Sequence, residues 1–237
     1  MANVKAYRKF GNVVYWDTHR ARMVGGIGTG VKFWRMNVHQ PLSAADALAG
    51  FTTTLVEGGA GESTVAAAVT INGGALLIST DAAENDGVNL QMQGESFQPA
   101  ADTMLYFGIK LRISEAMQSD LLVGLCITDT DLLGGMTDGM YFRKADGSTT
   151  MSAVLEQDSN ETTSTALTVA ANTDYWLEIV ANGVTVDFYV NGVMLAQMAQ
   201  TNVPDDELLT PSIHVLAGTT SAVTLTVKEW AVGRVAA

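Results

Sequence analysis

The chain has 237 residues, 47% hydrophobic and 16% charged, with a formal net charge of −12, so it is too apolar for a disordered chain and suits one large domain. No apolar run approaches the roughly 18 residues of a membrane-spanning helix, and the N-terminus lacks the apolar core of a secretory signal, so no membrane partner is expected. Cys126 is the only cysteine, which excludes an intrachain disulfide and predicts a buried, inert thiol in a protein that folds in a reducing compartment.

Residues 1–40 are predicted to form an extended N-terminal arm, and residues 41–237 a separate domain. Two short apolar and aromatic clusters, at 13–16 and 31–34, flank a glycine-rich segment at 25–30. That segment is too rich in glycine for a stable strand or helix. It also lacks the spacing of a dinucleotide-binding motif and a Walker lysine, so a flexible hinge is favoured over a phosphate site.

From residue 51 onward apolar and polar residues alternate, which is typical of strands with one buried face. The only helix expected is a short one at 43–49, with Ser43 as its cap. Strands are predicted at 64–70, 75–79, 87–93, 105–113, 121–128, 139–144, 150–157, 165–170, 212–217 and 222–234. So many short strands without a helical period predict an all-β fold, an antiparallel two-sheet jelly-roll sandwich.

Residues 174–199 are predicted to form a three-stranded meander. Their strands are separated by Asn182-Gly183 and Asn191-Gly192, pairs that tolerate the positive φ angles of a type I′ turn. Asp146-Gly147 and Asn72-Gly73-Gly74 are expected to turn two further hairpins.

No catalytic residue, metal site or cofactor is predicted from these motifs. Glycoside cleavage needs two carboxylates a few ångströms apart, and no run of carboxylates on alternate strand positions is present. Asp129 and Asp131 could bind calcium, with Asp138 as a further ligand, but a solvated acidic turn is favoured. His19, His39 and His214 lack metal-ligand spacing. We therefore expect that the chain is not an enzyme.

Charge is distributed unevenly along the chain, and this points to the arm as the binding element. Residues 1–39 contain seven basic residues and one acidic residue, a net +6, whereas the remainder contains six basic and 24 acidic residues, a net −18. Cations beside aromatic rings suit an acidic protein surface, while the acidic body would repel nucleic acid. The predicted partner-binding residues are Arg8, Lys9, Tyr15, Trp16, Arg20, Arg22, Lys32, Phe33, Trp34 and Arg35.

Two groups of residues carry a resemblance to known families. The runs Asp174-Tyr175-Trp176-Leu177-Glu178-Ile179 and Val186-Asp187-Phe188-Tyr189-Val190-Asn191-Gly192 resemble the late strands of concanavalin A-like (laminin G-like) jelly rolls. The whole chain resembles tailed-bacteriophage proteins encoded beside the major capsid protein, through residues 7–12, 17–20, 53–61, 85–89 and 138–142.

This second resemblance implies a capsid decoration (cement) protein that binds the outer shell of the virion, after assembly in the host cytoplasm, and reinforces it. The implied partners are the major capsid protein and further copies of the chain, as a homotrimer or dimer. A lectin-like, glycan-binding module of a head fibre or tail is the alternative. A polysaccharide-degrading enzyme is a third interpretation, which a pair of carboxylates in a cleft would support.

Overall fold

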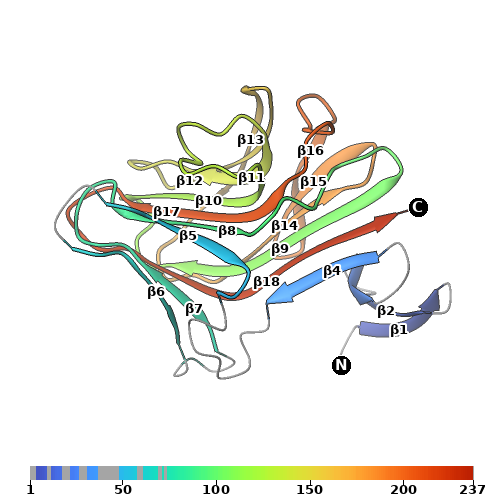
Figure 1. The fold of residues 1–237 in the computed structure, drawn as a ribbon, viewed down its shortest axis with the longest axis horizontal. Helices are drawn as coiled ribbons and strands as arrows, with labels where there is room; N and C mark the ends of the chain where they lie inside the picture. The colour runs from blue at the N-terminus through green and yellow to red at the C-terminus, as the bar shows by residue number, and fades with distance from the viewer. Residues whose placement is uncertain are drawn as a thin grey trace.

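The computed structural model describes residues 4–9, 12–17, 22–26, 31–36, 48–57, 61–68, 71 and 74–236. Within these ranges it is all-β, with two antiparallel sheets stacked as a sandwich (Figure 1). The predicted fold class, a concanavalin A-like jelly roll, is confirmed. Residues 43–47 of the predicted helix lie outside the described ranges, and residues 48–50 form a turn. Across the described ranges there is no helix with the length and apolarity that crossing a membrane requires.

One sheet of the sandwich has seven strands. In spatial order they are β13 (Asn160–Thr168), β12 (Thr150–Gln157), β11 (Gly139–Lys144), β10 (Ser119–Cys126), β17 (Thr210–Ala217), β8 (Gly87–Met92) and β5 (Phe51–Val56). Side chains alternate along each strand, so one face of this sheet enters the core and the other faces outward.

The second sheet has eight strands. Seven follow the order β16 (Val193–Ala199), β15 (Thr185–Val190), β14 (Tyr175–Ala181), β9 (Thr103–Ile113), β18 (Thr224–Ala236), β7 (Leu76–Ser79) and β6 (Thr64–Ala67). The eighth, β4 (Val31–Met36), pairs with the C-terminal half of β18, from Trp230 to Val235. Residues 31–36 of the predicted arm therefore complete the sandwich itself.

A small third sheet contains β1 (Val4–Lys9), β2 (Asn12–Asp17) and β3 (Arg22–Gly26). Its strand β3 contacts β4. Gly25 and Gly26 belong to β3, where the sequence predicted no stable strand, because pairing with Val14 and Tyr15 of β2 fixes their backbone. Residues 27–30 lie outside the described ranges.

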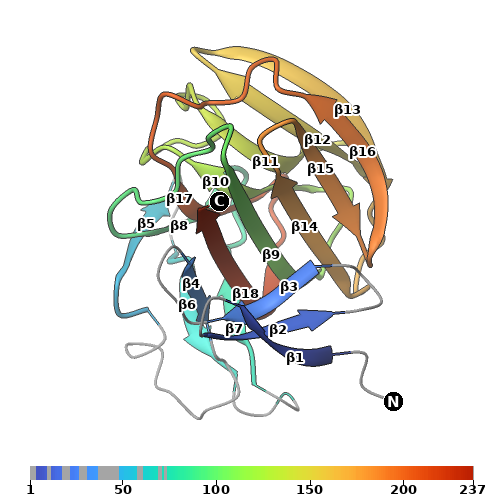
Figure 2. The same ribbon diagram turned by 90° about the vertical axis from the view of Figure 1, so that its right-hand side faces the viewer.

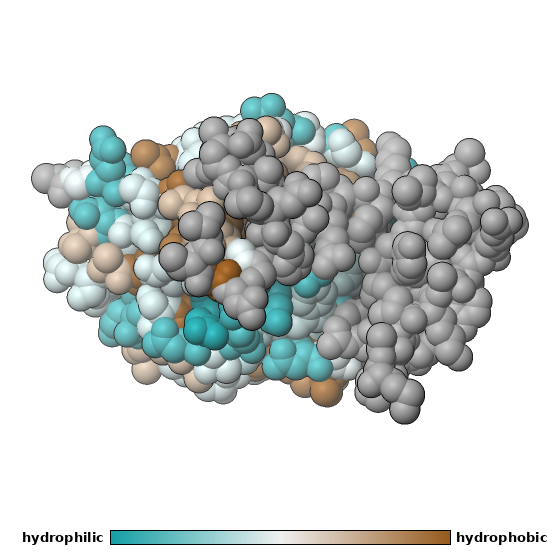
Figure 3. All heavy atoms as spheres, turned by 90° about the horizontal axis from the view of Figure 1, so that it is seen from below, coloured by the Kyte–Doolittle hydropathy of each residue, from teal (hydrophilic) through white to brown (hydrophobic). Residues whose placement is uncertain are grey.

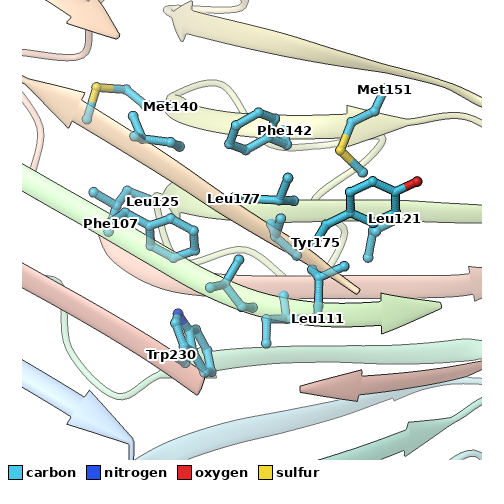
Figure 4. Packing of buried hydrophobic residues seen from close by; sticks show 14 of the residues in the cluster. Phe107, Leu111, Leu121, Leu125, Met140, Phe142, Met151, Tyr175, Leu177 and Trp230 are labelled. Carbon is cyan, nitrogen blue, oxygen red and sulfur yellow. The ribbon is translucent and has the colours of Figure 1, made fainter. Parts of the chain in front are cut away.

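The core lies between the two large sheets and receives residues from both. Phe107, Leu111, Tyr175, Leu177 and Trp230 come from the eight-stranded sheet, and Leu121, Leu125, Met140, Phe142 and Met151 from the seven-stranded sheet (Figure 4). The ring of Phe142 meets that of Phe188 edge to face at 5.2 Å between centroids. This contact joins β11 to β15, and hence one sheet to the other.

The predicted meander is present as β14, β15 and β16, but its two turns differ. Asn191 and Gly192 both have positive φ, 52° and 81°, as a type I′ turn requires. At the other turn Gly183 has φ 83° while Asn182 is not in the positive region. Asn182 Oδ1 instead accepts hydrogen bonds from the backbone N–H groups of Val184 and Thr185, so its side chain holds a longer loop.

The Asp146-Gly147 hairpin is also confirmed, between β11 and β12, with Gly147 at φ 71°. Asn72 and Gly73 lie outside the described ranges, between β6 and β7. Strand β5 was not among the predicted strands, because its sequence, FTTTLV, has only a weak alternation.

Candidate functional site

The outward face of the seven-stranded sheet carries a group of buried polar side chains. Asn89 and Gln91 on β8 pair in register with His214 and Ser212 on β17, and Tyr141 lies two strands farther along the sheet. All of these side chains are buried. A sheet face that is polar and yet buried has to be covered by another part of the chain.

The cover is the connection between β10 and β11, residues 127–138. Gln91 binds it twice, because its Nε2 donates to the Ile127 carbonyl at 2.9 Å and its Oε1 accepts from the Asp129 N–H at 3.0 Å. Asn89 Nδ2 donates to the Asp129 carbonyl at 2.7 Å. Farther along, apolar side chains of the cover pack in a small second cluster with residues of the sheet: Leu122, Cys126, Leu132, Met136, Tyr141 and Val154.

The acidic residues of this cover accept hydrogen bonds from within the cover and from the neighbouring turn between β12 and β13. Asp129 Oδ1 accepts from the Asp131 N–H, and Asp131 Oδ1 from the Gly134 N–H. Asp138 accepts from the Thr137 hydroxyl and from the Asp158 N–H. These carboxylates therefore stabilise tight turns, and over the described ranges no three His, Cys, Asp or Glu side chains are grouped as metal ligands.

A cluster of ionisable residues lies at the β12–β13 end of the same face. Tyr141 donates its hydroxyl hydrogen to Glu156 Oε2 at 2.6 Å, and its oxygen lies 3.4 Å from Glu161 Oε1. The two carboxylate oxygens are therefore at most about 6 Å apart. Arg143 holds Glu161 through a bidentate ion pair of 2.5 and 2.7 Å.

The environment moves the pKa values of the two glutamates in opposite directions. Burial raises the pKa of Glu156, because its charged form is poorly solvated. The Arg143 guanidinium lowers the pKa of Glu161 by binding its charged form. One carboxyl group is thus biased towards the acid and its neighbour towards the carboxylate, the combination that general acid–base chemistry uses. This pair was not predicted from the sequence, because carboxylates were expected at alternate positions of one strand and these two face each other across two strands.

Two further groups on this face are buried. His214 is 1% exposed, and burial lowers its pKa to about 4, against a smaller opposing effect of Asp131. Cys126 is fully buried, as predicted, and burial raises the pKa of its thiol. A neutral thiol out of reach of solvent is unreactive.

The residues predicted to bind a partner are distributed over the N-terminal strands. Arg8 and Lys9 end β1, Tyr15 and Trp16 lie in β2, and Arg22 begins β3, while four others, Lys32, Phe33, Trp34 and Arg35, lie in β4. Arg20 lies outside the described ranges. Strand pairing thus gathers the basic residues of β1 to β3 in the third sheet, and their role in binding stays a prediction.

Neither protein-family models nor curated protein sequences match this chain. Solved structures do. An endo-1,3-beta-glucanase from Streptomyces sioyaensis has a TM-score of 0.63 at 13% sequence identity, and the match covers 89% of this chain and 99% of the glucanase chain. The potassium-bound carbohydrate recognition domain of Emp46p has a TM-score of 0.59 at 11% identity, covering 83% and 94%. LamA from Z. galactanivorans, in complex with laminaritriose and laminaritetraose, has a TM-score of 0.60 at 6% identity, covering 84% and 97%.

These similarities correct the expectation that the chain is not an enzyme. Enzymes are among the proteins with this fold. The expectation also rested on the absence of a pair of neighbouring carboxylates, and the structure contains such a pair, Glu156 and Glu161. At such low identities the similarity establishes the fold alone. The chain is a concanavalin A-like jelly roll, a fold similar to those of the Streptomyces sioyaensis glucanase and the Emp46p carbohydrate recognition domain.

Proposed function

We propose that the protein binds the outside of a tailed-phage capsid and stabilises the shell, with residues 1–39 docking on acidic surfaces of the major capsid protein or of neighbouring copies. The observation that carries this proposal is the separation of charge, +6 in residues 1–39 against −18 in the rest. The protein would be assembled in the host cytoplasm and reside on the capsid exterior.

The way in which the N-terminal segment is attached to the sandwich supports this proposal. Strand β4 is hydrogen-bonded to β18, so the segment is tied to the sandwich at one defined place. Strands β1 to β3 pair only with one another in the third sheet and carry Lys5, Arg8, Lys9 and Arg22. A basic sheet outside the sandwich can reach a second surface, and many such contacts over a shell would add up by avidity.

The covered polar face is a second supporting feature. Residues 127–138 occupy the outward side of the seven-stranded sheet through Asn89 and Gln91. A large ligand would have to displace this cover to reach that face. A partner that binds at the N-terminal sheet needs no such rearrangement.

The proposal is tested by co-sedimentation with purified, undecorated phage capsids. The full chain should bind at about 0.05 M salt and at least tenfold more weakly at about 0.5 M, because contacts between exposed charges are screened. A variant lacking residues 1–27 loses β1 to β3 but keeps β4, so the sandwich stays complete; it should lose binding at both salt concentrations.

Lys110→Gln serves as the matched control, because it removes a positive charge from β9 of the sandwich and should bind as the full chain does. Equal binding by the truncated variant would contradict a docking role for the N-terminal sheet. If the full chain bound no capsid, decoration itself would be wrong.

Binding or cleavage of glycans is a second candidate, favoured by the Tyr141, Glu156 and Glu161 cluster. Two carboxyl groups a few ångströms apart with oppositely shifted pKa values fit the acid and the nucleophile of a retaining glycosidase. A 1,3-β-glucan is the first substrate to test, since two of the similar structures are a 1,3-β-glucanase and a LamA bound to laminari-oligosaccharides. Release of reducing ends by the wild type, abolished in both Glu156→Gln and Glu161→Gln, would support it; no release and no binding on a glycan array would reject it.

A further inference from the structure

One side of the sandwich is formed by the last strands of both sheets. Strand β13 ends the seven-stranded sheet and β16 ends the eight-stranded sheet, and the two lie side by side (Figure 2). Asn202 Nδ2, just after β16, donates to the Thr162 hydroxyl on β13 at 3.0 Å. We call this side, residues 162–173 and 188–204, the β13–β16 side.

Most of the β13–β16 side carries no charge, although the body of the protein is strongly acidic; the charged residues at its borders are Glu161, which is paired with Arg143, and Asp174, Asp187 and Asp205. Neither residues 162–173 nor residues 188–204 contain an acidic or basic residue, while the chain from residue 40 onward has a net charge of −18. Two copies approaching each other by most other surfaces would bring carboxylates together, and like charges repel. On the β13–β16 side, two copies can approach each other with less repulsion between carboxylates.

The same side exposes apolar side chains. Val193, Met194 and Leu195 at the start of β16 are 60%, 48% and 41% exposed. They are exposed together because the pairing with β15 shifts by one residue: Met194 faces Tyr189 and Ala196 faces Phe188, which leaves Leu195 unpaired in a bulge. Ala196 and Met198 then return to the core.

Edge strands of soluble proteins usually carry lysine, proline or inward-facing charges that prevent association. Strand β16 has none of these between Val193 and Ala199. On the face seen from below, hydrophilic residues form a band over part of the described surface (Figure 3). Three adjacent exposed apolar residues on an uncharged edge favour a contact surface.

We infer that a second copy of this chain docks on the β13–β16 side, with the Val193–Leu195 segments packed against each other across a two-fold axis. A two-fold contact uses the same patch on both copies, so an uncharged apolar segment is complementary to itself. This inference concerns the isolated protein and does not depend on capsid binding. It assigns a surface to self-association that is distinct from the N-terminal sheet.

The test is the molar mass of the purified full chain, measured by light scattering and sedimentation velocity. We expect a dimer that persists at about 0.5 M salt, because apolar contacts, unlike exposed ion pairs, are not screened. Leu195→Glu would place two carboxylates at the contact and should weaken the dimer at least tenfold.

The matched control is Leu55→Glu on β5, at the opposite end of the seven-stranded sheet, where Leu55 is 44% exposed. It adds the same charge at similar exposure and should leave the dimer intact, and thermal melting of both variants should match the wild type. A monomeric wild type, an assembly other than a dimer, or a dimer that survives Leu195→Glu would overturn the inference. None of these results bears on capsid binding.

Discussion

Replacing Lys144 with methionine is expected to lower the free energy of unfolding by about 3 kcal/mol. The Lys144 ammonium group is completely buried at the end of β11 and donates hydrogen bonds to the carbonyl oxygens of Ser119, Ala145 and Ser148. These bonds tie the start of β10 to the turn between β11 and β12. Methionine fills a similar volume but leaves the three carbonyl groups without this donor, and buried carbonyl groups without partners are costly.

Nearby carboxylates add to the effect. Burial lowers the pKa of Lys144, while Asp120, Asp146 and Glu115 oppose that shift by favouring the charged form. Without the cation these three acids lose a neighbouring positive charge. Urea unfolding measures the change, and the melting temperature should fall by roughly 6–12 °C for a protein of this size.

Lys110→Met is the control, because Lys110 lies on β9 with a partly exposed side chain and should change stability by no more than about 0.5 kcal/mol. An equal, small effect of both substitutions would show that the three carbonyl groups find other donors. In that case the loops around Lys144 would be held by their backbone alone.

Strands such as β9 and β14 could be predicted because apolar and polar residues alternate along parts of them, whereas β11 and β12 are buried on both faces over most of their length. The bounds predicted for residues 139–144 and 150–157 are those of β11 and β12. Alternation of apolar and polar residues has the same period as the side-chain directions of a strand, so the pattern and the structure coincide. The inward position of Lys144 breaks this pattern, and its partners lie in loops, so its role could not be predicted.

The carboxylate pair depends on one hairpin that the sequence does not signal. Glu156 meets Glu161 because β12 turns into β13 at Asp158 and Ser159, which have φ of 51° and 63°. Neither residue is glycine, and hydrogen bonds to Asp138 and Thr137 hold the turn in this conformation. Contacts from a distant segment thus replace the local turn signal, and the predicted strand began only at residue 165.

The pairing of β4 with β18 was equally hidden. Residues 31–36 and 230–235 are at opposite ends of the chain, and no local pattern indicates which strands become neighbours in a sheet. Composition identified the basic character of residues 1–39 and left their pairing open. Asp129 and Asp131 were interpreted as a solvated acidic turn, and their turn hydrogen bonds fit that interpretation. The contacts of residues 127–129 with Asn89 and Gln91 could not be predicted, because they join residues far apart in the sequence.

Acidification from pH 6.5 to pH 4 is expected to remove about 3 kcal/mol of stability through His214 alone. Burial lowers the pKa of this imidazole from 6.5 to about 4 in the folded protein. The unfolded chain therefore takes up a proton below pH 6.5, whereas the folded chain resists it until about pH 4. The contribution of the neutral imidazole is complete above pH 6.5 and is lost progressively as the pH falls to 4.

Comparison with His214→Gln isolates this effect, because every other titrating group is present in both proteins. Among these, Glu161 and Glu115 have lowered pKa values and Glu156 and Asp120 raised ones, so the total pH dependence mixes opposing contributions. Urea unfolding at pH 7, 5 and 4 should show the stability difference between the two proteins change by about 3 kcal/mol in favour of the variant. If the stabilities of the two proteins changed with pH in parallel, the charged imidazolium would be accommodated in the fold. That would require a hydrogen-bond acceptor or a water molecule beneath the 127–138 cover. The closed packing of that cover over the sheet would then be wrong.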